Sequence, residues 1–148
     1  MKSKVNRDTQ PSHLTVTHET RVRFNETDAL GIVWHGNYLK YFEDGREAFG
    51  RKHGLSYLDI EQNGFYTPIV KSMIEHLAPL KFGDIATIKT TLINTRAAKL
   101  IFRYEINDQH DTLVCKGETT QVFIDTKKDL AIIAPAFFKT WKAQHNLD

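Results

Sequence analysis

The order of hydrophobic and polar positions predicts a strand followed by a long helix. Residues 15–24 alternate between apolar and polar side chains, which is typical of a half-buried strand. From residue 38 to residue 49, apolar and small side chains recur at helical spacing. This pattern predicts a long amphipathic helix, with Asn37 as its N-cap and Gly54 as its C-terminal stop. Gly45 interrupts the apolar face, so we expect the helix to pack closely against a sheet.

After Gly64 the pattern changes from helical to extended. Four segments rich in β-branched and aromatic residues follow, and short polar turns separate them. The segments are 65–77, 84–95, 99–107 and 112–125. Short connections favour an antiparallel sheet with one face packed. Pro135 and the apolar spacing through Trp141 predict a closing helix. One long helix against one antiparallel sheet is an α+β architecture.

Length and composition indicate one globular domain. The chain has 148 residues, enough for a single substantial core. Residues 1–14 are mostly polar and lack the periodicity of a long element, so we predict a mobile N-terminal tail at 1–14 and a single domain at 15–148. Lys and Arg number 20 against 18 Asp and Glu, a net charge of +2. This balance is too small to predict nucleic acid or an anionic membrane as a partner.

Hydropathy and cysteine usage predict a cytoplasmic protein. The sequence has no apolar run of the roughly twenty residues that a membrane span needs, and no apolar centre of a secretory signal near its start. Cys115 is the only cysteine, so an internal disulfide is excluded. The seven histidines show no metal-binding spacing, and we predict no metal site.

The segment from Asn25 to Tyr38 carries the candidate chemistry. It places the carboxylate of Asp28, a turn at Gly31 and the start of the helix near His35 within eleven residues. A carboxylate can act as general base or nucleophile, and free N–H groups at a helix start can hold an oxyanion. Two simpler interpretations compete with this one. Asp28 can be a turn residue that bonds local backbone N–H groups, and His35 can be a polar residue of the helix start.

This segment resembles the hotdog-fold acyl-CoA thioesterases, in the branch of the 4-hydroxybenzoyl-CoA thioesterases with its YbgC-like and FadM-like members. The resemblance lies in residues 21–28, in Gly31 and His35, and in residues 37–43. A softer match covers residues 65–70 and 79–84. The resemblance to this family implies a long central helix wrapped by a curved antiparallel sheet, subunits paired edge to edge, and an active site at the dimer interface.

The resemblance also implies the function and its residues. We expect hydrolysis of an acyl-CoA thioester, with Asp28 and His35 as catalytic residues and with backbone N–H groups near His35 facing the thioester carbonyl. Gly31 would permit the turn or close approach of the substrate. Three apolar neighbours are expected to bind substrate, although packing in the core is an equal alternative. They are Ile32, Val33 and Trp34.

Further expectations concern the assembly and the substrate. The partner is acyl-CoA, no cofactor is needed because coenzyme A is part of the substrate, and the chain forms a homodimer or a homotetramer built from dimers. Glu43 is a second candidate carboxylate, since another branch of hotdog thioesterases carries its catalytic acid on the central helix. Candidate contacts for the coenzyme A phosphates are Arg96, Lys99, Lys127 and Lys128.

Two other functions fit the same sequence. One is a non-catalytic or dehydratase-like hotdog protein that binds acyl thioesters without cleaving them. The other is a structural domain with an apolar dimer edge. The nature of the acyl group, whether aromatic, short or long, does not follow from the sequence.

Overall fold

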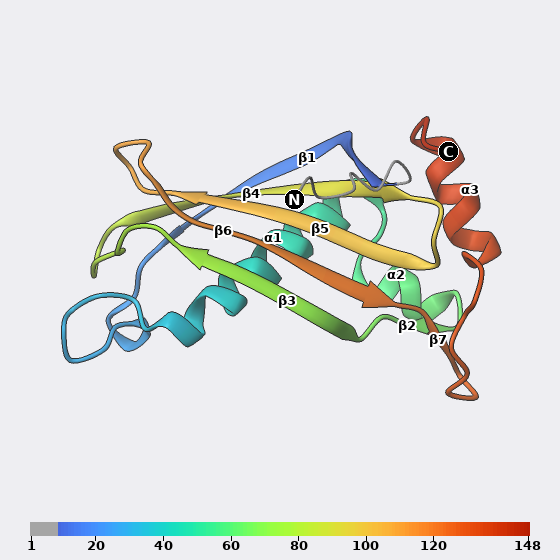
Figure 1. Ribbon diagram of the computed structural model, residues 1–148, viewed down its shortest axis with the longest axis horizontal. Helices are drawn as coiled ribbons and strands as arrows, with labels where there is room; N and C mark the ends of the chain where they lie inside the picture. Colours follow the sequence, from blue (N-terminus) through green and yellow to red (C-terminus); the bar gives the residue numbers. More distant parts are fainter. Residues whose placement is uncertain (1–8) are drawn as a thin grey trace, which may run out of the picture.

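The computed structural model describes residues 9–148 and has one long helix against one antiparallel sheet (Figure 1). The strands are β1 (Thr9–Arg21), β2 (Phe65–Tyr66), β3 (Ile69–His76), β4 (Ile85–Thr95), β5 (Lys99–Asn107), β6 (Leu113–Val122) and β7 (Ile124–Asp125). The helices are α1 (Tyr38–His53), α2 (Tyr57–Gln62) and α3 (Ala136–Gln144), with 3-10 turns at Phe24–Glu26 and His35–Asn37.

Five strands form the main sheet in the order β1-β4-β5-β6-β3, and every neighbouring pair is antiparallel. The short strands β2 and β7 form a separate antiparallel pair. Figure 1 shows α1 crossing one face of the sheet. The loop that precedes α1 lies at one end of the molecule, and α2, β2, β7 and α3 lie at the other end. The predicted α+β architecture is confirmed.

The core forms where the alternating strands face the apolar side of α1. In β5 every second residue from Leu100 to Ile106 is buried, as the sequence pattern predicts. Phe42 stacks on Tyr104 with 4.2 Å between ring centroids. A Cβ on Gly45 would lie 2.3 Å from the Thr90 hydroxyl oxygen, so only glycine allows the helix to approach the sheet this closely. The close packing expected from Gly45 is confirmed.

The first strand begins earlier than predicted. Residues 9–14 belong to β1, and Leu14 is buried, so the predicted boundary of the N-terminal tail at residue 14 is wrong. The alternating pattern breaks because the pairing of β1 with β4 shifts register between Pro11 and Thr15. Such an irregularity interrupts the two-residue periodicity on which strand prediction depends. Residues 1–8 of the predicted tail lie outside the described residues.

Two other predicted boundaries need correction. The segment 65–77 forms two strands, because Thr67 and Pro68 interrupt it and proline has no N–H to donate. The segment 112–125 also divides, at Phe123. Asn37 occupies the predicted N-cap position of α1, but its backbone is helical and its side chain donates to the Glu26 carbonyl instead of capping the helix.

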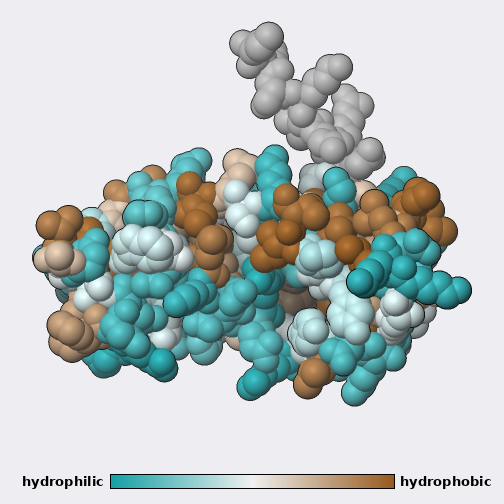
Figure 2. Space-filling model, turned by 90° about the horizontal axis from the view of Figure 1, so that it is seen from below, coloured by the Kyte–Doolittle hydropathy of each residue, from teal (hydrophilic) through white to brown (hydrophobic). Residues whose placement is uncertain are grey.

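The outer edge of β3 is open and carries exposed apolar side chains among polar ones. Within residues 9–148, β3 pairs only with β6. Ile69, Val70 and Met73 are 40%, 59% and 51% exposed along this edge strand. Figure 2, which shows the molecule from the side on which β3 lies in Figure 1, has apolar patches scattered across this face. No helix within residues 9–148 is long and apolar enough to span a membrane.

Candidate active site

Asp28 opens a tight turn between two short extended segments. The Asp28 N–H donates to the Ile32 carbonyl at 2.9 Å, and the Gly31 N–H donates to the Asp28 carbonyl at 3.0 Å. Gly31 has a φ of +76°, and a Cβ on it would meet no atom within 4 Å. Within this protomer, glycine is therefore needed for the left-handed backbone, and close approach of a substrate to Gly31 stays a prediction. A turn followed by a residue in this conformation is a common three-residue hairpin loop.

The Asp28 carboxylate is half-buried at the base of this turn. Its Oδ1 accepts a hydrogen bond of 2.8 Å from the Leu30 N–H, as a turn-forming aspartate does. The turn interpretation that the sequence left open therefore describes this oxygen. The hydrogen bonds found within residues 9–148 engage only Oδ1. The second oxygen thus keeps its lone pairs for a proton or an electrophile.

The carbonyl of Glu26 ties the turn to the start of α1. It accepts from the Trp34 N–H at 3.0 Å and from the Asn37 side-chain amide at 2.8 Å. Asn37 is 7% exposed, so this second bond is well shielded from water. Since Asp28 lies two residues after Glu26 and α1 begins directly after Asn37, these two bonds fix the carboxylate relative to the helix start.

The helix start presents backbone N–H groups. Trp34 is extended, and the chain then enters the 3-10 turn His35–Asn37 that leads into α1. The N–H groups of His35 and Gly36 occupy the first positions, which have no acceptor inside a helical turn. A Cβ on Gly36 would lie 2.2 Å from the Trp34 ring, so the indole covers the turn at this glycine.

The predicted substrate-binding residues differ in exposure. Trp34 is 49% exposed and Ile32 is partly buried, so both offer surface beside the turn. Val33 is 3% exposed within the core, and its N–H donates to the Leu80 carbonyl at 2.8 Å. In this protomer Val33 therefore fits the packing alternative. Contacts of Gly31, Ile32 and Trp34 with substrate stay predictions.

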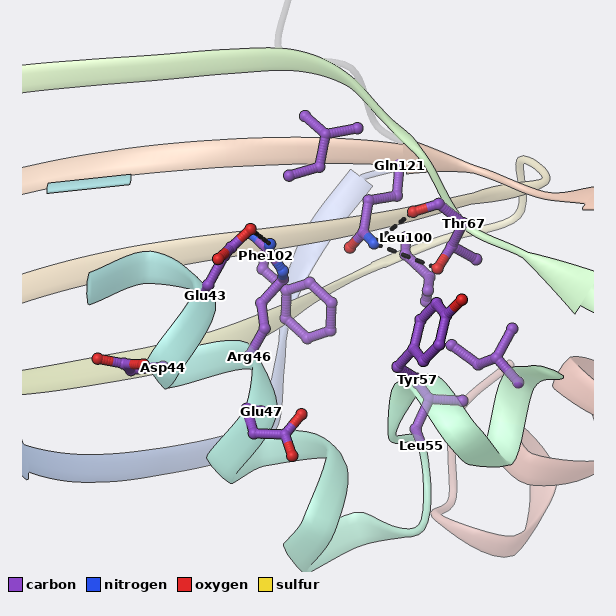
Figure 3. A pocket seen from close by; sticks show the side chains of 12 residues that line it. Glu43, Asp44, Arg46, Glu47, Leu55, Tyr57, Thr67, Leu100, Phe102 and Gln121 are labelled. Atoms are coloured by element: carbon purple, nitrogen blue, oxygen red, sulfur yellow. Dashed lines mark hydrogen bonds and ion pairs between the residues drawn. The ribbon is translucent and has the colours of Figure 1, made fainter. Parts of the chain in front are cut away.

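A cleft lies elsewhere, between α1, α2 and the sheet (Figure 3). It has a volume of about 590 Å³, and neither Asp28 nor His35 lines it. Its wall on α1 carries Glu43, Asp44, Arg46 and Glu47, and its floor includes Leu100, Phe102 and Gln121. Glu43, the second candidate carboxylate, therefore faces a cavity that the 27–33 loop of the same protomer does not enter.

Arg46 is the cationic group of this cleft. Its side chain is only 15% exposed and donates to the Tyr104 hydroxyl at 3.1 Å, while that oxygen and the Thr119 hydroxyl lie 2.6 Å apart. The Glu43 carboxylate is 3.9 Å from the guanidinium but 69% exposed, so this ion pair is weak. Burial raises the pKa of Tyr104, although the nearby Arg46 opposes this effect. The hydrogen bonds among Arg46, Tyr104 and Thr119 hold the Arg46 side chain in place, and they do not activate the Glu43 carboxylate.

Cys115 has no role as a nucleophile. The side chain is fully buried in the core. Burial raises the pKa of the thiol to about 12, so the thiolate is not populated near neutral pH. Across residues 9–148, no group of three or more His, Cys, Asp or Glu side chains is placed to hold a metal ion.

The fold and the Asp28 turn before the helix start point to a class of protein. Comparisons with known proteins identify this class. The chain belongs to the thioesterase-like superfamily, whose family model matches residues 22–141. The predicted hotdog fold, with a long helix wrapped by an antiparallel sheet, is confirmed.

Three known proteins illustrate the relationship. A putative acyl-CoA thioesterase, YneP of Bacillus subtilis, is 32% identical over 123 residues, covering 83% of this chain and 89% of YneP. The acyl-CoA thioester hydrolase YbgC of Escherichia coli O6:H1 is 29% identical over 108 residues, 73% of this chain and 81% of YbgC. A DHNA-CoA thioesterase structure from Staphylococcus aureus superposes with a TM-score of 0.80 at 24% identity, covering 89% of each chain, and supports the fold alone.

The sequence pointed to Asp28 and the helix start but missed what joins them. Nothing in the pattern identified the Glu26 carbonyl as the shared acceptor, and the only signal in the sequence was an asparagine at the helix start. The cleft also escaped prediction, because its walls come from five separate parts of the chain, within residues 43–47, 55–60, 67–69, 100–102 and at 121. The coenzyme A phosphate contacts stay predictions, since all four candidates are exposed cations.

Proposed function

We propose that this chain hydrolyses acyl-CoA thioesters, with Asp28 as the general base or the nucleophile. The proposal rests chiefly on the Glu26 carbonyl, whose two hydrogen bonds hold the Asp28 turn against the helix start. The N–H groups of His35 and Gly36 would form the oxyanion hole, where a backbone dipole acts whatever the side chain. The names of YneP and YbgC support acyl-CoA as the substrate.

Two routes use these groups. In the first, Asp28 removes a proton from water as the water oxygen attacks the thioester carbonyl carbon. In the second, an Asp28 oxygen attacks the carbonyl carbon directly, and water then cleaves the mixed anhydride. Negative charge collects on the carbonyl oxygen in both, the C–S bond breaks, and the departing thiolate takes up a proton. The His35 imidazole is the candidate donor of that proton.

We further propose that two protomers pair along β3 and share each active site. The β3 strand is an open edge with exposed apolar side chains, which is unusual unless another strand covers it. A two-fold axis through such an edge pairs the two copies of β3 in antiparallel fashion. The Ile69 end of one strand then lies beside the His76 end of the other.

This pairing would bring the two halves of the site together. The His76 ring lies 4.9 Å from that of Tyr38, the first residue of α1, so this end of β3 is close to the helix start. Ile69, at the opposite end of β3, lines the cleft. Antiparallel pairing therefore sets the Asp28 loop of one protomer beside the cleft of its partner. A tetramer would assemble from such dimers, and we propose a cytoplasmic location for it.

The test is Asp28→Asn, assayed with a panel of acyl-CoA thioesters and a thiol reagent. Asparagine keeps the Oδ1 acceptor of the Leu30 N–H, so the turn stays intact. Loss of a general base lowers kcat by about 10²- to 10⁴-fold. Asp148→Asn, at the other end of the chain, is the control and keeps wild-type activity.

Two results would contradict the proposal. One is Asp28→Asn protein that retains a third or more of wild-type kcat. The other is wild-type protein that releases no thiol from any thioester of the panel, which would support the binding-only alternative.

A further inference from the structure

The cleft contains a buried amide that is only half satisfied. Gln121, on β6, is 9% exposed. Its Nε2 donates to the Thr67 backbone carbonyl at 2.7 Å and lies 3.2 Å from the Thr67 hydroxyl. Its Oε1 is buried and has no hydrogen-bond partner among the described residues. Figure 3 shows this oxygen on the side of the amide that faces away from Thr67 and toward the cleft.

The orientation of the amide follows from Thr67. A backbone carbonyl only accepts hydrogen bonds, so the nitrogen of the Gln121 amide must face it. The oxygen is then forced to the opposite side. A buried acceptor without a donor is uncommon in folded proteins and costs free energy. The arrangement therefore points to a donor that enters the cleft from outside this protomer.

The charges of the cleft indicate which part of an acyl-CoA enters it. Three carboxylates line the wall on α1, those of Glu43, Asp44 and Glu47, against the single guanidinium of Arg46. That guanidinium already donates to Tyr104. Such a surface disfavours the phosphates of coenzyme A. The floor is formed by Leu100 and Phe102 and accepts an uncharged group.

We propose that the cleft holds the acyl group and that Gln121 determines its specificity, with Oε1 accepting a hydrogen bond from a hydroxyl of the acyl group. Gln121 therefore favours hydroxyacyl thioesters over the same thioesters without the hydroxyl. The inference rests on the proposed thioesterase function and adds to it the class of acyl group and the residue that recognises it. A site built around a buried acceptor rejects a ligand that lacks the donor.

The first test uses the wild-type protein and pairs of acyl-CoA thioesters that differ by one hydroxyl. Aliphatic and aromatic pairs, with the hydroxyl at several distances from the thioester, are compared by kcat/KM. We expect at least one pair to favour the hydroxylated member by about tenfold or more. Hydrolysis of the panel without such a preference in any pair would overturn the inference and leave the proposed function standing.

The second test uses Gln121→Met, which keeps the side-chain length and removes the acceptor. The hydroxyl preference of the favoured pair should fall at least about fivefold, while Gln144→Met, an exposed glutamine on α3, leaves it unchanged. Thermal unfolding and sedimentation establish that each variant is folded and assembled. An unchanged preference in folded Gln121→Met would contradict the inference. An equal loss for both members of every pair would also contradict it, because the donor would then be a pantetheine amide.

Discussion

The two ends of this molecule are built in different ways. At one end, the Asp28 turn and the helix start are formed by residues close in sequence and held by backbone hydrogen bonds. At the other end, the cleft is walled by side chains from α1, α2, β3, β5 and β6, which meet only in the folded chain. The first end carries the Asp28 carboxylate and the N–H groups of the helix start, and the cleft at the other end is not lined by Asp28.

This difference agrees with the proposed function, in which one end carries out the chemistry and the other recognises the acyl group. Local hydrogen bonds fix a carboxylate and peptide dipoles rigidly, as catalysis requires. A cleft lined by side chains changes its shape with each substitution, as specificity requires. Within one protomer the two ends are separate, so the proposed pairing along β3 is what makes them one site.

The largest effect should come from breaking the proposed dimer, which would separate the Asp28 loop of one protomer from the cleft of its partner. Met73 is 51% exposed on β3, and Met73→Lys would place two like charges near the two-fold axis and leave the core untouched. We expect a folded monomer with kcat/KM reduced by about 10²-fold or more. Met73→Leu is the matched control and stays dimeric and active. Sedimentation and circular dichroism accompany the assay, and a folded monomer with full activity would refute the shared site.

A smaller effect should distinguish backbone from side chain at the helix start. His35→Ala keeps the N–H and removes only the imidazole, so we expect a loss of kcat below about tenfold. Asn37→Ala removes the bond to the Glu26 carbonyl and lets the helix start move, which should cost about 10- to 100-fold. If His35→Ala proved the more damaging of the two, the imidazole and not the peptide dipole would be the main contributor.

The smallest effect concerns stability at low pH and belongs to the cleft end. The pKa of His53, near the end of α1, is lowered chiefly by burial. The positive charges of His145, Lys52 and His13 lower it further. The unfolded chain then binds a proton more readily than the folded one, so stability rises with pH. The stability therefore falls as the pH drops below about 6.5, the ordinary pKa of histidine.

Thermal unfolding between pH 7.5 and 5.5 measures this effect. His53→Gln should reduce the fall in Tm between these two pH values. His110→Gln, an exposed substitution in the turn between β5 and β6, should leave the fall unchanged. Equal slopes in the wild-type protein and His53→Gln would show that His53 does not control acid sensitivity.

Sequence prediction succeeded where structure is local. The helical spacing around Gly45 and the alternation from Leu100 to Ile106 each encode a buried face directly, and both were confirmed. Prediction failed where long-range contacts decide. The register shift after Pro11 hid the start of β1, and Asn37 bonds a residue eleven positions away instead of capping its helix. The Gln121 amide could not be placed from sequence, because its partner Thr67 lies 54 positions earlier.

Mixing two inactive variants tests the shared site most directly. Asp28→Asn removes the carboxylate, and Thr67→Trp, at the lining of the cleft, fills the cavity. In a mixed dimer, the intact Asp28 of one chain faces the intact cleft of the other. When equal amounts of the two variants are unfolded and refolded together, half of the dimers are mixed. Each mixed dimer has one complete site of its two, so the account predicts about a quarter of wild-type activity. Activity no greater than that of the separate variants would contradict it, because each site would then lie within a single protomer.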